Sequence, residues 1–534
     1  MEVGIDFGTT FSTLCFSPGK GVDGCVRESD TIYIPTIVGV RPDGTYTVGL
    51  GALQEEGLLL YRDIKRYFGM NVFNKDEFLA KLSPSFEVIV DGWGASIGPT
   101  NGEKGKTKSV ISLACLFVSA LTSLAVRMCG ENISVSVCSV PAEYNTYMRG
   151  FIFKSCSLAN ISVQAVVNEP TAAGLSAFVT VDKNDVKYML VYDFGGGTFD
   201  ASLLAVGPAY VCVLDSLGDN YLGGRDVDKA LANLVSSRLS LQPGSIDSFS
   251  MEALKIDIVD NPKATLRRVL TGAGTIFDVP ISEHDFRNLC KPLVERAKSI
   301  VQNLLRRNDV SSCVAVLIGG SSVLPGVVNS VAELKGIRQV LFDKNTYRAA
   351  VAIGAAIYAQ TFSGTSRYRL IDCISNSLSD ERQPLRAITV FPKGHPIPSS
   401  VSVKFKMPSH DTGVVLHEGE SSFINMNART FSASVKREAF RQGVEYLQVF
   451  NISEDGRLTV KMGDVVLRNL VEPKEPPTSE YNLRYLSSDD KRIKPEVSYV
   501  KLFYSKLFGD STLPSKSTAE RKQLYSTHGL VVDF

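Results

Sequence analysis

The stretch Val191–Leu204, VYDFGGGTFDASLL, decides the fold of this chain, because a stretch near the N-terminus repeats its pattern. That earlier copy is Val3–Leu14, VGIDFGTTFSTL. In both copies an apolar run ends in Asp-Phe-Gly, a turn of Gly and Thr follows, and a second apolar run begins. Short apolar runs bounded by Gly are typical of strands. The two copies therefore predict two hairpins of the same kind, one in each half of a domain.

The residue types in the two turns favour binding of a polyphosphate. Glycines let backbone N–H groups approach an anion without hindrance from a Cβ atom, and Thr hydroxyls add donors. The carboxylates of Asp6 and Asp193 would repel a phosphate directly, but they can hold a divalent cation through water. Two such turns that face each other would enclose a polyphosphate together with Mg²⁺.

Two further glycine turns fit the same kind of site. VAVLIGGSSVLPGV and GDNYLGGRDVDKAL each place a glycine pair before an expected helix, where backbone amides can approach a phosphate or a sugar. One such turn alone is usually an ordinary connection between a strand and a helix, but four of them in this order favour a nucleotide site. The residues of these two turns are Gly223, Gly224, Gly319, Gly320 and Ser321.

The composition excludes several classes of protein. The 534 residues carry a net charge of +1, which gives no general attraction to nucleic acid or to membranes. Ten Cys without a C-x-x-C pair predict reduced thiols packed in the core. The start MEVGIDFG does not have the pattern of a secretory signal. Val110–Val126 is just long enough to span a membrane but carries four hydroxyl residues, so we expect a buried helix and no transmembrane segment.

The chain divides into four parts by pattern. Residues 1–362 alternate Val-rich runs with amphipathic segments, which predicts an α/β domain. Residues 363–374 are expected to form a linker. Residues 375–470 have period-two patterning and turn signals, which predict an antiparallel β domain. Residues 471–534 begin with a Pro-rich stretch and show weak periodicity.

The ordered motifs resemble the actin-like ATPase superfamily and, within it, the heat shock protein 70 (Hsp70) chaperones. The segments that carry the resemblance are GIDFGTTFS, VPAEYN, VVNEPTAAGLSAF, VYDFGGGTFDASLL, GDNYLGGRDVD, LIGGSSVLPGV and AVAIGAAIYA. PKGHPIPSS, LHEGESS and EDGRLTVKMGD more weakly resemble the β-sandwich peptide-binding domain of that family. The resemblance implies an α/β fold in which a two-lobed ATPase domain precedes a small β-sandwich and a short C-terminal region with a truncated lid.

The resemblance also implies which residues bind ATP or ADP and Mg²⁺. Asp6 and Asp193 would hold the metal ion through water. Lys65, in RDIKRYFG, resembles the catalytic lysine that positions the attacking water and stabilises charge on the γ-phosphoryl group. The implied catalytic set is Lys65, Glu169, Asp193, Thr198 and Asp200. The implied nucleotide contacts are Gly8, Thr9, Thr10, Phe11, Gly195, Gly196, Gly197, Gly223, Gly224, Lys263, Gly319, Gly320 and Ser321.

The adenosine side of the implied pocket departs from the family pattern. Arg225 stands where the family usually has an acidic residue, and Arg267 stands where it has a Ser. Ala264 and Val323 replace the two basic residues that would stack on adenine. Each lost cation–π contact is worth roughly 0.5–2 kcal/mol. We therefore expect weaker or less base-selective nucleotide binding than in a cellular chaperone.

The part after the β domain is too short for the full helical lid of the family, and the chain ends in GLVVDF instead of an acidic tail. In this respect the chain resembles the Hsp70 homologues of closteroviruses. That resemblance implies a protein of the virion and of the host plant cytoplasm and plasmodesmata, with roles in virion-tail assembly and cell-to-cell movement. The implied partners are viral capsid proteins, other virion-tail proteins, host movement or J-domain-type factors and, only indirectly, genomic RNA.

Three functions remain open from the sequence. The expected one is a viral assembly and movement factor that hydrolyses ATP slowly to ADP and phosphate. The second is a folding chaperone that cycles on unfolded peptides, against which the short C-terminal part argues. The third is a catalytically silent structural relative, against which the presence of Lys65, Glu169 and Asp200 argues.

Overall fold

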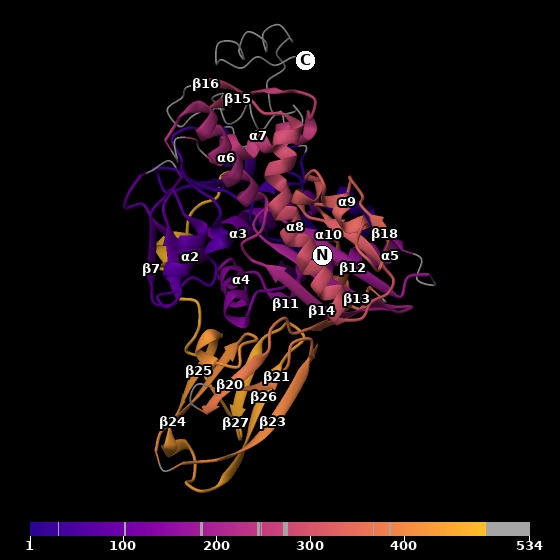
Figure 1. Ribbon diagram of the computed structural model, residues 1–534. Helices are drawn as coiled ribbons and strands as arrows, with labels where there is room; N and C mark the ends of the chain where they lie inside the picture. The colour runs from indigo at the N-terminus through magenta and orange to yellow at the C-terminus, as the bar shows by residue number, and fades with distance from the viewer. Residues whose placement is uncertain are drawn as a thin grey trace.

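The computed structural model describes residues 1–487 except 30, 101–102, 182–184, 243–245, 247, 271–275, 367, 384–385 and 409. Most of the C-terminal region 471–534 therefore lies outside the described residues. A large α/β part, coloured indigo to pink in Figure 1, precedes a smaller part made of strands and coloured orange.

The first sheet of the large part has the strand order β11-β10-β1-β2-β3. Its centre is an antiparallel hairpin of β1 and β2, and β10 pairs in parallel with β1 while β11 pairs in parallel with β10. The strands are β1 (Glu2–Asp6), β2 (Phe11–Cys15), β3 (Ile34–Pro35), β10 (Val135–Val140) and β11 (Val163–Asn168).

The second sheet repeats this plan in the order β18-β17-β12-β13-β14-β19-β22. The hairpin of β12 and β13 is antiparallel, β17 pairs in parallel with β12, and β18 pairs in parallel with β17. The predicted pair of matching hairpins is therefore confirmed, and each hairpin lies at the centre of its sheet. The strands are β12 (Tyr188–Phe194), β13 (Phe199–Val206), β14 (Tyr210–Asp219), β17 (Cys313–Ile318), β18 (Ile337–Leu341), β19 (Arg369–Cys373) and β22 (Pro396–Ile397).

Two helices, α5 (Glu169–Thr180) and α10 (Ala350–Phe362), pack against each other between the sheets. Their apolar residues share one core with β10, β12 and β17. Gly354 makes the crossing possible, because a Cβ atom there would overlap the backbone of Ala172. The helix crossing holds the two sheets, and therefore the two hairpin turns, in a fixed relation.

The remaining helices surround these sheets (Figure 1). Helices α3 (Val110–Cys129) and α4 (Thr146–Leu158) share a core with the first sheet. Helices α6, α7, α8 and α9 share a core with the second sheet. Their bounds are Gly224–Leu239, Ser248–Asp260, Glu283–Arg307 and Val327–Ala332. Within the described residues, α3 has the length and apolar composition of a membrane-spanning helix, but 78% of its most apolar window is buried inside the protein, as expected for a core helix.

Smaller elements complete the large part. They are α1 (Gly49–Gln54), α2 (Lys75–Leu82), β4 (Val38–Val40), β5 (Tyr46–Val48), β6 (Leu59–Tyr61), β7 (Val88–Asp91), β8 (Gly94–Ile97), β9 (Lys108–Ser109), β15 (Leu266–Leu270), β16 (Ile276–Pro280) and the 3₁₀ turns η1 (Pro18–Gly24), η2 (Ile64–Tyr67) and η3 (Gly320–Val323). All ten cysteines are unpaired thiols, as predicted from the sequence.

The smaller part consists of two antiparallel four-stranded sheets, β21-β20-β24-β25 and β23-β26-β27-β28. Side chains from both sheets, such as Phe391, Leu416, Phe431 and Phe450, form one hydrophobic core. The elements are β20 (Leu378–Gln383), β21 (Arg386–Phe391), β23 (Ser399–Lys406), β24 (Thr412–Glu418), η4 (Ile424–Met426), β25 (Ala428–Val435), η5 (Arg437–Ala439), β26 (Glu445–Ile452), β27 (Leu458–Met462) and β28 (Val465–Val466).

Part of the connection between the two parts is the strand β19. Within 363–374, where we expected a linker, β19 pairs with β14 of the large part and with β22. Asp372 on this strand accepts a hydrogen bond from Asn168, and Glu418 of the smaller part accepts one from the backbone N–H of Thr146. Strand pairing satisfies the polar backbone groups of β19, so this segment is fixed against the large part.

After the smaller part, residues 471–487 return to the large part, and we call them the return segment. Val471 is buried in the core of the first sheet, and α11 (Thr478–Tyr481) contacts α3. The backbone of residues 484–486 pairs with Tyr46 at the edge strand β5, and the rings of Tyr46 and Tyr485 lie 5.5 Å apart. The described portion of the expected lid region therefore packs on the large part.

Candidate functional site

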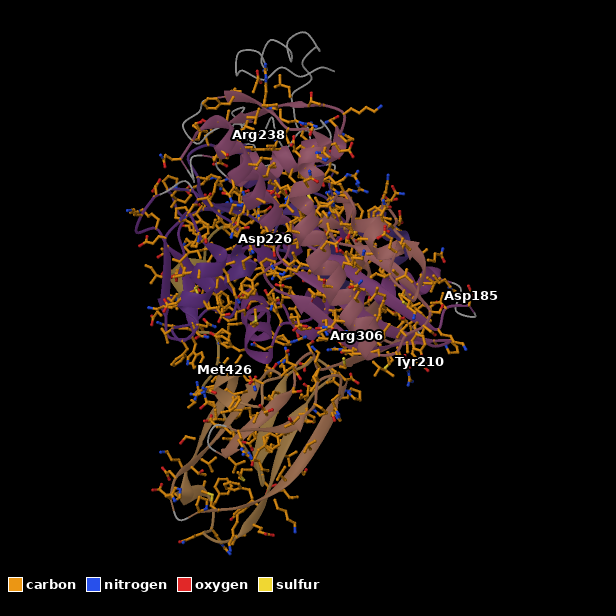
Figure 2. The ribbon with its side chains drawn as sticks, viewed as in Figure 1. Asp185, Tyr210, Asp226, Arg238, Arg306 and Met426 are labelled. Carbon is orange, nitrogen blue, oxygen red and sulfur yellow. The ribbon has the colours of Figure 1, made fainter. Side chains whose placement is uncertain are left out.

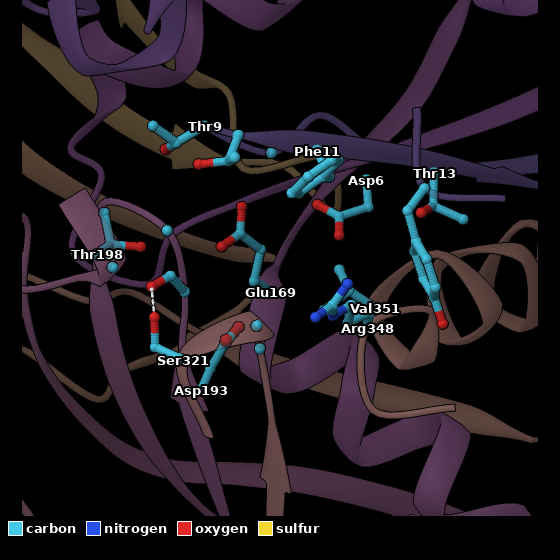
Figure 3. A pocket seen from close by; sticks show the side chains of 18 of the residues that line it. Asp6, Thr9, Phe11, Thr13, Glu169, Asp193, Thr198, Ser321, Arg348 and Val351 are labelled. Carbon is cyan, nitrogen blue, oxygen red and sulfur yellow. Dashed lines mark hydrogen bonds between the residues drawn. The ribbon is translucent and has the colours of Figure 1, made fainter. Parts of the chain in front are cut away.

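A pocket lies where the turns of the two central hairpins face each other (Figure 3). The turns come from opposite sheets, so each half of the large part supplies one wall. Most of the residues implied by the sequence line this pocket: Asp6, Gly8, Thr9, Thr10, Phe11, Lys65, Glu169, Asp193, Gly195, Gly196, Thr198, Gly224, Gly319, Gly320 and Ser321.

The two hairpin turns come so close that glycine is required between them. A Cβ atom at Gly196 would overlap the hydroxyl of Thr10, and one at Gly197 would lie 2.9 Å from Thr9 Oγ1. Gly223 supports the second turn from behind, since its Cβ would lie 2.6 Å from the backbone nitrogen of Gly197. Gly197 and Gly223 therefore hold the turns together without lining the pocket themselves.

The third glycine turn is tied to the second. Gly319 has a φ of +83°, in the left-handed region that favours glycine. The hydroxyl of Ser321 donates a hydrogen bond of 2.8 Å to the carbonyl of Gly195. The third turn is thus bonded to the second turn, and residues of both turns line the pocket.

Lys65 and Glu169 form a buried ion pair in the pocket, with Lys65 Nζ donating to Glu169 Oε1. Lys65 belongs to η2, which follows Asp63 in the left-handed conformation. Glu169 is the first residue of α5. The hydroxyl of Tyr144 donates to the backbone carbonyl of Lys65 at 3.1 Å. The lysine is therefore held at a defined place with its ammonium facing the carboxylates of the site.

Three carboxylates line the pocket together with this lysine, and Figure 3 labels them as Asp6, Glu169 and Asp193. Burial and the nearby Glu169 raise the pKa of Asp6 to about 7, although Lys65 acts in the opposite direction. Burial, Glu169 and Asp200 raise the pKa of Asp193 well above its usual value. Burial and Glu169 likewise raise the pKa of Asp200. The raised pKa values of these three carboxyl groups reflect the burial of several negative charges close together. A bound cation would stabilise their ionised forms.

This donor set fits Mg²⁺ held mainly through water. Mg²⁺ keeps several waters and takes one or two carboxylates together with phosphate oxygens. Among the described residues, no three His, Cys, Asp or Glu side chains gather as a closed metal site. Asp200 Oδ2 is buried without a hydrogen-bond partner in the described structure, while Oδ1 accepts from the N–H of Ala142 at 3.0 Å. Asp6 and Asp193 line the pocket. Asp200 does not line it, but it is the partner of Asp193 in the pairing of β12 with β13.

Lys263 does not line the pocket; it is exposed in the turn after α7. The cation that α7 contributes is Lys255, together with Glu252 and Ile256. These three residues lie on one helix face at spacings of three and four, which is the pattern that could have identified them. Sequence reasoning also missed five other lining residues: Thr13, Tyr33, Tyr347, Arg348 and Val351.

Arg225, which departs from the family pattern, joins the two halves of the large part. Its Nε donates to Asp63 Oδ1 at 2.8 Å, and its Nη1 donates to Glu252 Oε2 at 3.1 Å. Arg62 donates to the same Glu252 oxygen at 2.9 Å. Arg62 and Asp63 adjoin η2 beside the first sheet, whereas Arg225 and Glu252 lie on α6 and α7 beside the second. We call these four residues the interlobe charge cluster, where a lobe means the half of the large part that is built on one of the two large sheets.

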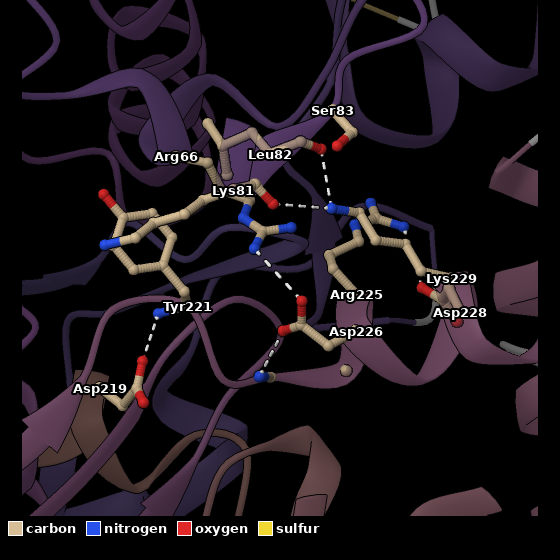
Figure 4. Close-up of polar contacts among 12 residues, drawn as sticks. Arg66, Lys81, Leu82, Ser83, Asp219, Tyr221, Arg225, Asp226, Asp228 and Lys229 are labelled. Carbon is tan, nitrogen blue, oxygen red and sulfur yellow. Dashed lines mark hydrogen bonds and ion pairs between the residues drawn. The ribbon is translucent and has the colours of Figure 1, made fainter. Parts of the chain in front are cut away.

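Further contacts cross between the halves near this cluster (Figure 4). Arg66 lies 3.8 Å from Asp226, whose other oxygen accepts from the N–H of Gly223 at 2.8 Å. Lys229 donates to the backbone carbonyl of Leu82 at 2.7 Å. Figure 2 shows Asp226 among the packed side chains in the middle of the large part. Charged contacts therefore join the two halves of the large part beside the pocket, which Glu252 lines.

Comparisons with known proteins agree with this arrangement. A family model described as Hsp70 protein matches residues 2–474. The movement protein Hsp70h of Grapevine leafroll-associated virus 3 is 34% identical over 477 residues, which cover 88% of this chain and 86% of that protein. The movement protein Hsp70h of Beet yellows virus is 31% identical over 460 residues, covering 81% of this chain and 75% of that protein.

A cellular chaperone is also similar. The chaperone protein DnaK of Thermus thermophilus is 29% identical over 449 residues, which cover 78% of this chain and 70% of that protein. Members of the Hsp70 family bind ATP or ADP with Mg²⁺ in general. With a family match over nearly the whole described length and this pocket between two like sheets, the chain belongs to the Hsp70 family.

Proposed function

We propose that the chain is an ATPase that binds Mg²⁺-ATP between two lobes, one built on each large sheet, and hydrolyses it slowly. The observation that carries this proposal is the facing pair of glycine-threonine turns with Lys65, Glu169, Asp6 and Asp193 between them. Backbone N–H groups of the two turns would donate to phosphate oxygens.

The side chains of the site have separable roles in this proposal. Lys65 orients the attacking water and offsets charge on the departing γ-phosphoryl group, which is the kind of stabilisation that dominates phosphoryl transfer. Glu169 fixes the Lys65 ammonium through their ion pair. Mg²⁺, held through water by Asp6 and Asp193, would neutralise the phosphate oxygens. Thr198 and Asp200 complete the wall behind the reacting phosphate.

We assign domains within the same proposal. Residues 1–362 form the two-lobed ATPase domain of the actin-like kind, and the duplicated strand order of the two sheets supports this. Residues 375–470 form a β-sandwich that resembles a peptide-binding domain, which two antiparallel sheets on one core support. Residues 363–374 connect them, and 471–534 form a short C-terminal region.

The biological role that we propose is virion-tail assembly and cell-to-cell movement through plasmodesmata in a plant host. The two viral relatives are named movement proteins, and the identity to them exceeds the identity to DnaK. Viral capsid proteins and other virion-tail proteins would be direct partners, host movement or J-domain-type factors further ones, and genomic RNA an indirect one.

Steady-state ATP hydrolysis, measured with and without an unfolded peptide, tests the function. Slow turnover that the peptide does not change supports the viral factor. Peptide stimulation of several fold favours the alternative, a folding chaperone, which the similarity to DnaK suggests. If the chain does not bind ATP at all, the remaining explanation is a catalytically silent structural relative of the family. Co-sedimentation of the purified chain with filamentous particles then tests the assembly role, and a chain that stays in the supernatant contradicts it.

A further inference from the structure

Arg348 lines the nucleotide pocket, and none of the segments that carry the family resemblance contains it. It lies just before α10, and Figure 3 shows it among the lining side chains with Asp6 and Val351. Its guanidinium carbon lies 5.4 Å from the ring centre of Tyr33 and 5.2 Å from that of Tyr347. Tyr33 comes from the first lobe and Tyr347 from the second, so rings from both lobes position this one side chain.

The charge balance of the pocket singles out Arg348. Three cationic side chains line it, and two of them have carboxylate partners, since Lys65 pairs with Glu169 and Lys255 lies 2.8 Å from Asp228. Arg348 has no such partner among the described residues, and its Nε atom is buried without an acceptor. The side chain as a whole is half-buried, and an unpaired cation with one buried donor that lacks an acceptor offers a position for an anionic group of a ligand.

The position of Arg348 indicates which part of a nucleotide would supply that group. A Cβ atom built on Gly320 would lie 4.0 Å from Arg348 Nε. The N–H of Gly319 donates to the carbonyl of Tyr347 at 3.1 Å, so the backbone next to Arg348 is bonded to the third glycine turn. Two ring contacts already surround the guanidinium, which leaves its N–H groups to bind oxygen atoms. A guanidinium matches the geometry of phosphate oxygens.

We propose that Arg348, positioned by Tyr33 and Tyr347, binds the phosphate chain of the nucleotide beside the Gly319–Gly320 turn. This inference rests on the proposed function, since it assigns a contact within the same site. It gives the pocket a second cation for the phosphates in addition to Lys65. The chain therefore holds its nucleotide through the phosphates even where contacts to adenine are reduced.

Isothermal titration of the full chain with ADP and with adenosine tests the assignment. Arg348→Gln should weaken ADP binding about ten-fold or more, because a hydrogen-bonded charge pair is lost, and should change adenosine binding less than two-fold. Arg348→Lys keeps the positive charge but loses the paired N–H donors of the guanidinium. Its ADP affinity should lie between those of the wild-type chain and of Arg348→Gln. The matched control is Arg338→Gln, which removes a surface arginine paired with Asp185 and should leave ADP binding unchanged.

A second pair of variants tests the support of Arg348 by Tyr33. Tyr33→Leu removes the ring and should weaken ADP binding several fold, whereas Tyr33→Phe keeps the ring and should not. The thermal melting temperature of each variant is measured as a control, and it should stay close to that of the wild-type chain.

The possible failures of the two proposals can be told apart. A wild-type chain that does not bind ADP overturns both. Unchanged ADP binding by Arg348→Gln, with normal wild-type binding, overturns this inference alone. Equal losses for ADP and adenosine would place Arg348 on the nucleoside and overturn its assignment to phosphate.

Discussion

Lys65 donates a hydrogen bond to Glu169 inside the pocket between the two hairpin turns, which places an ammonium group among several buried carboxylates. Lys65 is 2% exposed, and Glu169 is 8% exposed. The pair connects the first lobe to α5, the helix that packs between the sheets. A substitution that removes the Lys65 ammonium therefore removes positive charge from a site rich in carboxylates.

Lys65→Ala should lower ATP turnover by about 10²–10³-fold, because it removes a group that stabilises developing charge. ADP affinity should stay within a few fold, since the phosphate loops remain. Steady-state hydrolysis and titration calorimetry measure the two effects. Lys81→Ala, which removes an exposed lysine paired with Glu77, is the matched control. Turnover that survives in Lys65→Ala would show that the catalytic assignment is wrong.

Gly196→Ala should weaken ADP binding by about ten-fold, because overpacking of a tight contact costs roughly 1–3 kcal/mol. The added methyl group would overlap the hydroxyl of Thr10 and push the two turns apart. Gly19→Ala is the control, since a Cβ atom at Gly19 has no neighbour within 4 Å. Equal ADP affinities of the two variants would contradict the close approach of the turns.

Arg225→Ala should destabilise the large part by about 3–5 kcal/mol, because it leaves the half-buried Asp63 and the buried Glu252 with less positive charge. Denaturant unfolding followed by tryptophan and far-UV signals measures the loss. Arg287→Ala removes an exposed pair with Glu283 and should change stability by less than about 1 kcal/mol. If the two variants unfold at the same denaturant concentration, the interlobe charge cluster does not hold the lobes together.

Val471→Ala should destabilise the chain by about 2 kcal/mol and expose the return segment to proteases, because Val471 is buried in the core of the first sheet. Val444→Ala, at a position 42% exposed in the smaller part, should have little effect. Limited proteolysis with mass spectrometry locates the cleavage sites. Resistance of residues 471–487 in both variants would show that the return segment is held independently of Val471.

ATP and GTP should bind with affinities within about ten-fold of each other, because neither Ala264 nor Val323 lines the pocket and neither can stack a cation on the base. Titration of the same preparation with both nucleotides measures the ratio. Micromolar binding of ATP together with strong rejection of GTP would contradict this expectation.

The structure places most of the predicted site residues in the pocket and a few outside it. Gly196 and Thr10 were expected on facing turns, and they are in contact range. Lys263 was expected at the nucleotide and is exposed outside the pocket, whereas Lys255 lines it. The first prediction depended on a local motif that recurs in two copies. The prediction of Lys263 depended on which face of α7 lies against the pocket. A single sequence does not determine that face.

The sequence by itself determined the two hairpins, their glycine-threonine turns and the carboxylates at their ends, because strand patterning and glycine turns are set by residues close together in the chain. Only the tertiary structure decided that Tyr33 and Arg348 meet, that Arg225 bridges the lobes and that residues 471–487 return to the first sheet. These contacts join residues far apart in sequence, and they form only when burial of the cores brings the sheets and helices together.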